Sequence, residues 1–428
     1  MQKKAQKEYL RRLYFSFLAA ASPERCLDKV KPFQNSGKIL CVGIGKASLV
    51  YCKVLQNKIK SHYEGIIVTN SLEDKKGISE KFKLFHASHP IPNKNGLEAS
   101  KYLMDKVSIL DSKDLLLCLV SGGGSSLLPC PPLGFQLEDE IALNRSLLSS
   151  GAPITVLNLI RKHFSRIKGG RLARLASPAK VRTLVVSDIP DDDIRQVASG
   201  PTLATPGTLR DAICAINDYK IIIPENIMRF FHEEKVDTPT PDDPYFLDND
   251  QELLASASKS MKSVVKEIKA THAKVVVISN RSEGEARNVA VEHLEIIQDY
   301  FSNNNLSPGE EIIFLSGGET SVTISNPEGK GGRNGEYLLS LALGLETANF
   351  RSFVAIAADT DGIDGTEKNA GAIIDQDTLA KVREKNLMPE KLLRENNSYL
   401  AFEAAGDLFF TGTTGCNVND FRAIIFNI

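Results

Sequence analysis

The segment DLLLCLVSGGGSSLLPCP, residues 114–131, runs from a row of apolar residues directly into three glycines flanked by serines. A short apolar run that ends at a turn signal is typical of a buried strand in a parallel sheet. Because glycine loses more backbone freedom on folding than other residues, three in a row indicate an unusual turn or close approach of a ligand. The N–H groups and hydroxyls of residues 121–126 suit phosphate or carboxylate oxygens. The alternative is a mobile surface linker.

Similar apolar runs recur along the whole chain. They alternate with stretches whose apolar residues recur at helical spacing, which predicts an α/β fold with mainly parallel sheets flanked by helices. The predicted strands are residues 38–43, 65–70, 114–120, 181–187, 274–279, 311–316, 353–358 and 422–426. The predicted helices are an amphipathic helix at the N-terminus and residues 96–110, 155–167, 250–270 and 283–302.

The length of the chain, 428 residues, predicts two domains, because a single core rarely grows to this size. The segment HEEKVDTPTPDDPYFLDND, residues 232–250, is rich in Pro and Asp and has no period. We interpret it as a linker, with an ordered surface loop as the alternative. We therefore predict a Rossmann-like α/β domain over residues 1–235 and a second α/β domain over residues 250–428.

The two halves contain similar loops. LCLVSGGGSS, from residue 117, and IFLSGGETS, from residue 313, both end a predicted strand in Ser-Gly-Gly. Ligands of open α/β folds bind at the carboxyl ends of the strands. We therefore expect the active site in a cleft between the domains.

The composition is that of a soluble globular enzyme. The chain has 42% hydrophobic residues, 25% charged residues and a net charge of -1, which gives no electrostatic footprint for nucleic acid. No window approaches the roughly 18 apolar residues that a membrane span needs. The seven cysteines have no disulfide or metal-binding spacing, so we expect a reducing cytoplasm.

The segment LCVGIGKAS places Gly43, Gly45 and Lys46 between a predicted strand and a predicted helix. Backbone N–H groups and the helix dipole at such a junction favour an anion. The segment is not a P-loop, because one residue separates the glycines and Ala47 replaces the hydroxyl residue. As a dinucleotide-binding pattern it is incomplete, since Ser48 stands at the third glycine position. The alternative is a tight turn with a solvated lysine.

Two further segments of the first half carry charge. In VVSDIP, Asp188 lies just past a predicted strand, where carboxylates often hold Mg²⁺ directly or through water. RKHFSRIKGGRLARLASP, residues 161–178, is basic along a predicted helix. This helix has either a solvated basic face or a cation that reaches an anionic ligand, namely Arg161, Lys168 or Arg171.

The second half contains two glycine-rich loops. LSGGETSVTI contains Ser316, Gly317, Gly318 and Glu319, and GKGGRNGEY delivers Arg333 to the start of a predicted helix. Arginine in such a place is suited to bidentate contact with carboxylate or phosphate. The alternative is a solvated arginine in a surface turn. Glu319 would position a metal, a hydroxyl or Arg333 itself.

An acidic loop follows another predicted strand. AADTDGIDG contains Asp359, Asp361 and Asp364, but it is not a calcium-binding EF-hand, because Ala370 stands where the closing Glu is needed. The chain also lacks a nucleophile elbow, a zinc-protease motif and a recognisable triad order. Glycine loops, one or two cations and several carboxylates remain. These are the groups of phosphoryl transfer, in which positioning and charge neutralisation carry most of the catalysis.

Nine segments form a set when taken in order: VGIGKAS, HPIPNKNG, SGGGSSLL, GAPITVLNLIRKHFSRIKGGRLA, SDIPDDDIRQVASGPT, SGGETSVTI, GGRNGEYLLSLAL, DTDGIDG and TGTTGCNVNDF. Together, over nearly the whole chain, they resemble the class II glycerate kinases, the glycerate 2-kinase family with a C-terminal MOFRL domain. The resemblance implies two α/β domains. It also implies transfer of the γ-phosphate of ATP to D-glycerate with Mg²⁺, which gives 2-phosphoglycerate.

The resemblance also implies a set of site residues. The catalytic positions are Lys46, Arg333 and Asp188, and the Mg²⁺ positions are Asp188 and Asp361. The substrate- and nucleotide-binding positions are Gly43, Gly45, Ser121, Gly122, Gly123, Gly124, Ser125, Ser316, Gly317, Gly318, Glu319 and Asn334. In this hypothesis the carboxylate of glycerate pairs with Arg333 and the Ser121 loop, and Lys46 neutralises charge on the transferring phosphoryl group. Asp188 holds Mg²⁺ or accepts the proton of the C2 hydroxyl.

Some positions depart from the family pattern. The departures are Asn93, Gly335, Asp359, Thr413 and Cys416. They lie in segments that bear on substrate preference and on the nucleotide loop, and the catalytic positions are retained.

Two other functions use some of the same residues. One is an NAD-dependent hydroxy-acid dehydrogenase that binds its cofactor at Gly43 and Gly45. The other is a non-catalytic phosphosugar-binding module, which gives no function to the acidic and arginine-bearing loops of the second half. In each case we expect a small-molecule ligand, no nucleic-acid or membrane partner, and a monomer or homodimer in the cytoplasm.

Overall fold

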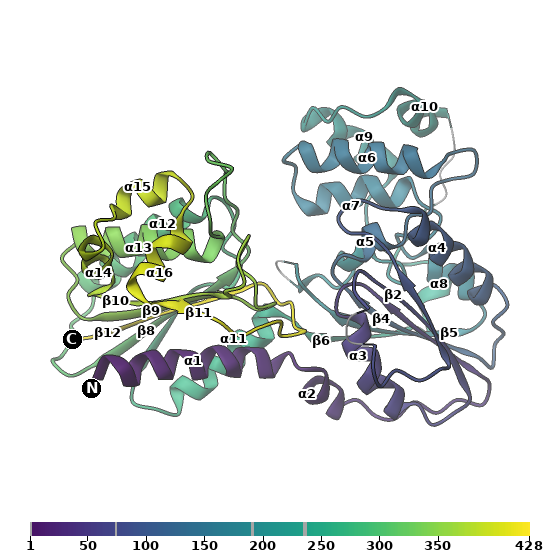
Figure 1. Cartoon of the computed structure of the whole chain (residues 1–428). Helices are drawn as coiled ribbons and strands as arrows, with labels where there is room; N and C mark the ends of the chain where they lie inside the picture. The colour runs from purple at the N-terminus through teal and green to yellow at the C-terminus, as the bar shows by residue number, and fades with distance from the viewer. Residues whose placement is uncertain (1, 73–74, 190–191, 234–237) are drawn as a thin grey trace. The chain divides into compact units, whose positions relative to one another are not determined.

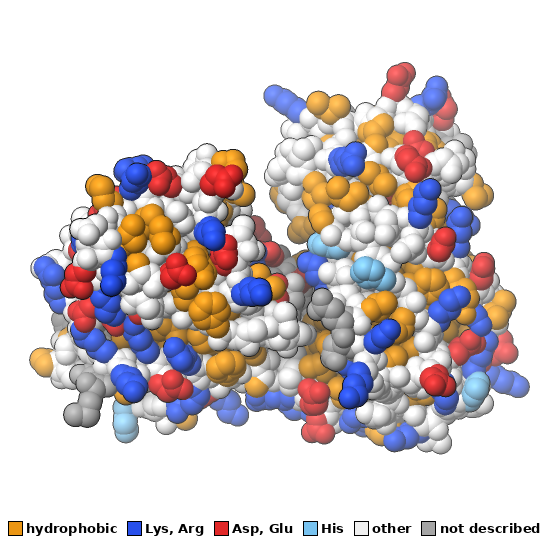
Figure 2. All heavy atoms as spheres, in the orientation of Figure 1, with side chains coloured by type: hydrophobic (Ala, Val, Ile, Leu, Met, Phe, Trp, Pro, Cys, Tyr) orange, Lys and Arg blue, Asp and Glu red, His pale blue; other side chains and the backbone are white. Residues whose placement is uncertain are grey.

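The computed structural model describes residues 2–72, 75–189, 192–233 and 238–428, which form two compact units (Figure 1). We call residues 23–254 the central unit, and residues 1–22 together with residues 255–428 the terminal unit. Within the described ranges, every helix is too short or too polar to cross a membrane. Basic and acidic side chains are interspersed over the visible face of each unit (Figure 2).

The central unit is built on a six-stranded sheet of order β3-β2-β1-β4-β5-β6. Its strands are β1 (Ile39–Ile44), β2 (Tyr63–Thr69), β3 (Phe82–His86), β4 (Leu115–Ser121), β5 (Lys180–Val186) and β6 (Asp250–Ala255). The first five of these strands pair in parallel. Their continuous apolar sequences fit this position, since a parallel sheet is covered on both faces. The strand order reverses between β1 and β4, so their carboxyl ends form the switch point at which such sheets bind ligands.

Two groups of helices cover this sheet. The helices that pack on it or beside it are α2 (Pro23–Asp28), α3 (Ser48–Leu55), α4 (Lys94–Val107), α5 (Gly124–Leu127) and α8 (Arg171–Ala176). A separate helical layer consists of α6 (Leu137–Ser149), α7 (Ile154–His163), α9 (Leu209–Asp218) and α10 (Glu225–Glu233), at the top of the central unit in Figure 1. This layer has its own apolar cluster, which includes Leu147, Ile160 and Phe164.

The terminal unit contains a second six-stranded sheet, of order β11-β10-β9-β12-β8-β7. Its strands are β7 (Lys274–Ser279), β8 (Glu311–Gly318), β9 (Phe353–Asp359), β10 (Gly371–Asp375), β11 (Leu408–Phe409) and β12 (Asp420–Asn427). β7 and β8 pair in parallel, whereas β12 lies antiparallel between β8 and β9, and β10 is antiparallel to β9 and β11. The predicted α/β class with two helix-flanked sheets is confirmed. The sequence did not reveal that β10 and β12 run against the other strands.

Helices lie on both faces of the second sheet (Figure 1). One face is covered by α12 (Ala286–Asn303), α13 (Arg333–Thr347), α14 (Thr378–Glu384), α15 (Pro389–Arg394) and α16 (Ser398–Ala405). The other face is covered by α1 (Gln2–Ala20) and α11 (Ala257–Lys269).

The N-terminal helix α1 packs in the terminal unit, although the sequence analysis grouped it with the first domain. The hydroxyl of Tyr14 donates to the carbonyl oxygen of Asp359 at 2.8 Å. The ring of Phe17 lies 5.1 Å from the ring of Phe421. An amphipathic helix must bury its apolar face against some partner, and this partner lies more than 300 residues further along the chain. Local sequence carries no signal for such a contact.

The helix predicted over residues 250–270 is wrong in its first seven residues. The first six form the edge strand β6, and α11 begins only at Ala257. The side chain of Ser256 accepts from the backbone N–H of Lys259 at 3.2 Å and so caps the helix. A short strand directly before a helix is hard to separate from it by apolar period alone.

Where it is described, the Pro- and Asp-rich segment of residues 232–250 is an ordered loop of the central unit. The hydroxyl of Thr238 accepts from Arg171 at 2.9 Å. The amide oxygen of Asn249 accepts from the N–H of Val181 at 3.0 Å. The predicted domain end at residue 235 falls outside the described residues.

Replacing Phe17 with Ala should lower the free energy of unfolding by about 3 kcal/mol, because a buried aromatic ring loses its contacts and leaves a cavity. Phe17 is fully buried, whereas Phe15 on the same helix is 50% exposed. Phe15→Ala should therefore cost about 1 kcal/mol or less. Urea unfolding followed by far-UV circular dichroism measures both values. Equal losses in the two variants would contradict this packing of α1.

Candidate active site

The loops that follow β1 and β4 are tied together at the switch point. The N–H of Lys46 donates to the carbonyl oxygen of Gly122 at 2.9 Å. The hydroxyl of Ser121 donates to the carbonyl oxygen of Ile44 at 3.2 Å. Gly45 has a φ of +114°, and a Cβ at this position would overlap Ser121. Both the backbone conformation and the close approach of the loops therefore require glycine here.

Each of the three glycines of the Ser121 loop is needed for a different reason. A Cβ at Gly122 would overlap the carboxylate of Asp188, and a Cβ at Gly124 would lie 2.6 Å from the Cβ of Ala198. Gly123 has a φ of +81° and stands directly before α5. The glycines thus let the loops after β4 and β5 pack closely, and they place the Asp188 carboxylate against the main chain.

A cavity of about 210 Å³ opens at this point. Its walls come from the loops after β3, β4 and β5 and from the helices α6 and α7. The lining includes the side chains of His89, Asn144, Asn158, Arg161, Asp188 and Gln196. Leu148 and Ile154, which are 51% and 38% exposed, add an apolar side to the same cavity. Exposed apolar side chains are visible on this helical layer in Figure 2.

The cavity is lined by the Arg161 guanidinium and the Asp188 carboxylate, and the Lys46 side chain lies beside its glycine loop. Burial, together with Lys46 and Arg161, lowers the pKa of His89 to about 4, so its imidazole is neutral at pH 7. Burial also lowers the pKa of Arg161 to about 10, which leaves this guanidinium charged at pH 7. A Cβ at Gly123 would lie 3.1 Å from both the Lys46 and the His89 side chains. Lys46 and His89 therefore flank the middle glycine of the loop.

Of the three cations that the sequence analysis considered in residues 161–178, Arg161 lines the cavity. Lys168 is buried and pairs with Glu140 at 2.6 Å. Arg171 is also buried, and its guanidinium donates to the carbonyl oxygen of Lys162 at 2.5 Å. The basic segment is therefore mostly interior, and the prediction of a solvated face is wrong for Lys168 and Arg171.

A strained turn forms another part of the wall. Ala198 and Ser199 have φ values of 54° and 57°, a conformation that costs about 1 kcal/mol or more in residues with a side chain. The hydroxyl of Ser199 lies 2.7 Å from that of Ser125 and donates to Asn158 at 2.8 Å. Ser125, a predicted binding residue, is thus tied to this turn. Strain of this kind is typical of functional sites.

In the terminal unit, Arg333 begins α13 and is surrounded by carboxylates. Its Nε donates to Asp420 at 3.0 Å, and one terminal nitrogen donates to Asp359 at 2.6 Å. The other terminal nitrogen donates to Glu319 at 3.1 Å. The Glu319 contact was one of the predicted options. Asp359 was singled out in the acidic loop and as a departure from the family pattern, but not as a partner of Arg333, and Asp420 was not recognised.

Asp364 and Asn334 organise the start of the same helix. The Asp364 carboxylate accepts from the N–H groups of Asn334 and Gly335 at 2.9 and 2.8 Å. Burial raises the pKa of Asp364 to about 6, although these two hydrogen bonds oppose the rise. The side chain of Asn334 donates to Asp420 at 2.9 Å. Asp361 accepts from the N–H of its neighbour Ile363 at 2.8 Å in a local turn.

A buried chain of contacts supports Asp420. Arg422 donates to it at 2.6 Å, and both side chains are almost completely buried. The Arg422 guanidinium lies 5.0 Å from the centre of the Tyr337 ring. The Tyr337 hydroxyl lies 2.9 Å from Nδ1 of His293. Burial and the Arg422 charge lower the pKa of His293 to about 3. These contacts fix the carboxylate that orients Arg333.

Other predicted positions lie within the sheets. Gly43 belongs to β1, and a Cβ there would lie 2.7 Å from the sulfur of Cys52 on α3. Ser316, Gly317 and Gly318 belong to β8, which extends to the third of them. As ligand-binding residues these four stay predictions.

Within the described ranges, no group of three or more His, Cys, Asp or Glu side chains is arranged to hold a metal ion. Mg²⁺ in nucleotide sites is usually held by one or two carboxylates together with the phosphates. A single carboxylate at the cavity, that of Asp188, fits that mode of binding.

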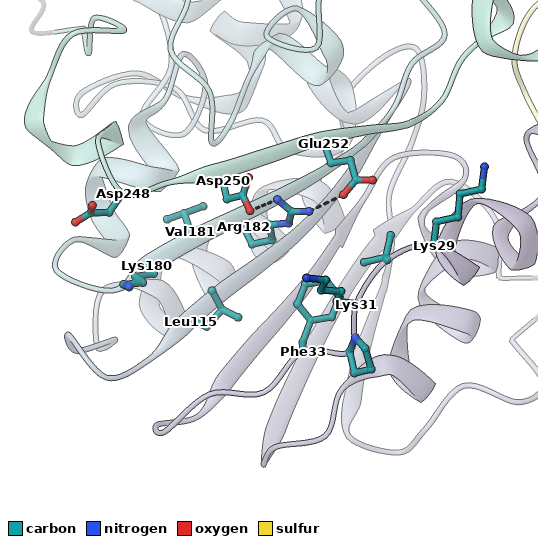
Figure 3. Close-up of a pocket in the computed structure, with 12 residues that line it drawn as sticks. Lys29, Lys31, Phe33, Leu115, Lys180, Val181, Arg182, Asp248, Asp250 and Glu252 are labelled. Carbon is teal, nitrogen blue, oxygen red and sulfur yellow. Dashed lines mark hydrogen bonds and ion pairs between the residues drawn. The ribbon is translucent and has the colours of Figure 1, made fainter. Parts of the chain in front are cut away.

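A larger cavity, of about 480 Å³, lies at the amino ends of β4 and β5, beside Leu115 and Lys180. Figure 3 shows Arg182 in this cavity, paired with Asp250 and Glu252. Its central cation is thus already paired, and the cavity lies at the edge of the sheet away from the switch point. The smaller cavity is therefore the better candidate for the active site.

Comparison with known proteins places these features in a family. Residues 9–232 match the family described as a domain of unknown function, DUF4147, and residues 312–420 match the MOFRL family. A D-glycerate 2-kinase of Thermotoga maritima is 34% identical over 94% of this chain and 94% of its own length. The chain belongs to the glycerate kinase family with a MOFRL domain. The resemblance inferred from the sequence motifs is confirmed.

A solved structure and another relative also bear on the function. The crystal structure of glycerate kinase from Thermotoga maritima superposes with a TM-score of 0.84 at 31% identity, covering 99% of this chain and 100% of that one. A protein of Agrobacterium vitis named "Putative hydroxypyruvate reductase" is 39% identical over 91% of this chain and 99% of its own.

Acid should destabilise the protein through His293. Its folded-state pKa of about 3 lies below the ordinary value of 6.5, so below pH 6.5 the unfolded state binds a proton that the folded state does not. The stability that neutral His293 contributes is fully present above pH 6.5. It is lost as the pH falls toward 3, at about 1.4 kcal/mol per pH unit. Between pH 7 and pH 5 the loss should therefore reach about 2 kcal/mol.

Urea unfolding of the wild type and of His293→Gln at both pH values measures this difference. The difference between their free energies of unfolding should be about 2 kcal/mol smaller at pH 5 than at pH 7. His272→Gln is the control, because His272 is exposed, and it should follow the wild type. A gap for His293→Gln that does not change with pH would contradict the prediction.

Proposed function

We propose that this protein is an ATP-dependent glycerate 2-kinase, which transfers the γ-phosphate of ATP to the C2 hydroxyl of D-glycerate. The observation that carries the proposal is the cavity at the switch point, where two cations, Lys46 and Arg161, and the Asp188 carboxylate lie at the glycine loop. Phosphoryl transfer depends on fixed positive charge and on positioning. Membership of the glycerate kinase family supports the choice of acceptor.

Lys46 and Asp188 carry the chemistry in this proposal. Lys46 neutralises charge on the transferring phosphoryl group, since its side chain flanks Gly123 in the loop. Asp188 holds Mg²⁺ or accepts the proton of the attacking hydroxyl, and its contact with Gly122 fixes its position for either task. Bound Mg²⁺ would neutralise the phosphates of ATP.

Arg333 is the second catalytic cation in the proposal. Its contact with Glu319 is the exchangeable one, because the Glu319 side chain is 56% exposed while those of Asp359 and Asp420 are buried. An anionic group of a ligand would replace Glu319. The two buried carboxylates would keep the guanidinium in place.

We further propose that the enzyme works in the cytoplasm. All seven cysteines are free thiols, and four of them are buried. Proteins of oxidising compartments commonly pair their cysteines. A monomer and a homodimer both stay compatible with the proposal.

The Agrobacterium vitis relative is named as a reductase, so the NAD-dependent dehydrogenase has to be compared with the kinase. Two contacts at the β1–α3 junction count against it. Ser121 fills the space beside Gly45, and the hydroxyl of Ser48 donates to the carbonyl oxygen of Gly45 at 2.7 Å. A dinucleotide site needs open main chain and a third glycine here.

Replacing Lys46 with Ala should lower kcat/KM for D-glycerate by about 10³-fold, because a fixed positive charge at the transferring group is lost. Lys76→Ala is the matched control, since Lys76 is exposed and lies outside the cavity, and it should retain full activity. ADP release with ATP, Mg²⁺ and D-glycerate measures both. Near-normal turnover of Lys46→Ala would remove Lys46 from the mechanism.

The product of the same reaction identifies the hydroxyl that is attacked. Coupling to enolase without phosphoglycerate mutase gives a signal only from 2-phosphoglycerate, the expected product. A signal that requires the mutase would assign attack to the C3 hydroxyl. Oxidation of NADH by hydroxypyruvate without ADP release would instead favour the dehydrogenase.

Replacing Gly122 with Ala should lower kcat by about 100-fold or more, because the new Cβ would displace the Asp188 carboxylate. Gly134→Ala is the control: it adds a Cβ in open space, although its φ of +90° makes it the more strained substitution. Turnover and thermal unfolding are compared for the two variants. Unchanged turnover in Gly122→Ala would show that the position of Asp188 is not critical.

A further inference from the structure

Arg161 faces the candidate cavity with its charge not balanced by a carboxylate. Its Nε donates to the amide oxygen of Asn144 at 2.9 Å, and one terminal nitrogen donates to that of Asn158 at 3.2 Å. Both partners are neutral. Glu140 is the acidic residue whose charge bears on the pKa of Arg161, but it pairs with Lys168 at 2.6 Å. Among the described residues, no carboxylate lies within ion-pair distance of Arg161.

Arg333 is in the opposite situation. Its guanidinium is surrounded by the carboxylates of Asp420, Asp359 and Glu319. Burial by itself would lower the pKa of this guanidinium, but the three negative charges raise it. A carboxylate ligand that approached Arg333 would meet three carboxylates already in place. A carboxylate ligand that approached Arg161 would meet a partly desolvated cation without such a partner, which is the arrangement that gives strong charge-assisted hydrogen bonds.

The cavity has the size of a small acid. Its volume of about 210 Å³ lies below the roughly 300 to 1,000 Å³ of sites for drug-sized ligands. A three-carbon acid fits such a space, whereas a whole nucleotide does not. Leu148, Ile154 and Ile189 line the same cavity and limit it on the apolar side.

We infer that Arg161, oriented by Asn144 and Asn158, is the residue that binds the carboxylate of the acceptor acid. Asn158 also accepts from Ser199, whose hydroxyl contacts Ser125 of the glycine loop. The carboxylate anchor and the loop are thus connected by hydrogen bonds. The identity of the acid rests on the proposed function, whereas the binding of a small carboxylate at Arg161 does not require turnover.

The inference predicts a preference for acids over polyols. A site built around a partly buried cation rejects a ligand that leaves this cation unpaired. The acceptor class is therefore small 2-hydroxycarboxylates, and glycerol, which lacks the carboxylate, should be a poor acceptor. Anchoring the carboxylate also determines which hydroxyl lies beside Asp188 in the same cavity.

The test is Arg161→Gln, which keeps hydrogen-bond donors but removes the charge. KM for D-glycerate should rise by about 100-fold or more, because a charge-assisted ion pair is lost, while KM for ATP should stay within about twofold of the wild type. Arg161→Lys keeps the charge without the forked geometry, so its KM for D-glycerate should lie between those of the wild type and Arg161→Gln. Arg166→Gln is the matched control, because Arg166 is exposed and close in sequence.

Calorimetric titration of nucleotide-free enzyme with D-glycerate gives a readout that does not depend on turnover. The wild type and Arg166→Gln should bind, and Arg161→Gln should bind at least about 100-fold more weakly. The uncharged analogue glyceramide should bind the wild type and Arg161→Gln equally weakly. Should Arg161→Gln not fold, as judged by its melting temperature, the same comparison is made with Arg161→Lys.

The outcomes separate the two proposals. Wild-type binding that depends on Arg161, without ADP release, would overturn the kinase proposal and support the inference. Normal D-glycerate binding and KM in both Arg161 variants would overturn the inference and leave the kinase proposal standing. A rise in KM for D-glycerate in Arg333→Gln but not in Arg161→Gln would assign the carboxylate to Arg333 and also overturn the inference.

Discussion

The close crossing of the two loops that follow β1 and β4 is the constraint on which the central site depends. The parallel register pairs Ile44 with Val120, so both strands end at the same level and their loops leave from adjacent points. The loops can touch only because Gly45 has no side chain, which lets the Ser121 hydroxyl reach the main chain of Ile44. This contact brings Lys46 and the glycine loop to one place. A side chain at residue 45 would separate them.

Arg333 in the terminal unit and Arg161 in the central unit have opposite electrostatic surroundings. In the terminal unit, negative charge gathers around Arg333, and Arg422 and Asn334 hold Asp420 in position. This arrangement orients the guanidinium firmly and offers a ligand anion only the position that the exposed Glu319 side chain occupies. In the central unit, Arg161 is held by neutral amides, and burial lowers its pKa. Such an unbalanced charge disfavours the empty site and strengthens binding of an anion.

The sequence predicted what local chemistry determines. Strands such as residues 114–120 are recognisable because a buried parallel strand is apolar throughout, and the glycine loops are recognisable because few other structures use consecutive glycines. The missed features depend on residues far apart in the chain. Asp420 meets Arg333 across 87 positions, and the directions of β10 and β12 follow from pairing partners that no local pattern specifies. Arg161 was considered only as one of three basic residues, because its neutral partners come from another helix and from its own.

The buried basic segment of residues 161–178 has a structural role at the candidate active site. The N–H groups of Gly169 and Gly170 donate to the carbonyl oxygens of Ser199 and Gly200 at 2.9 and 2.7 Å. These bonds hold the turn whose positive φ values are unfavourable for residues with side chains. Ser199 in turn contacts Asn158, which orients Arg161. The ion pair of Lys168 with Glu140 fixes the segment from the other side. The segment whose sequence resembles a solvated basic helix thus supports the wall of the cavity. Such support is needed because a strained turn persists only where the surrounding structure holds it in place.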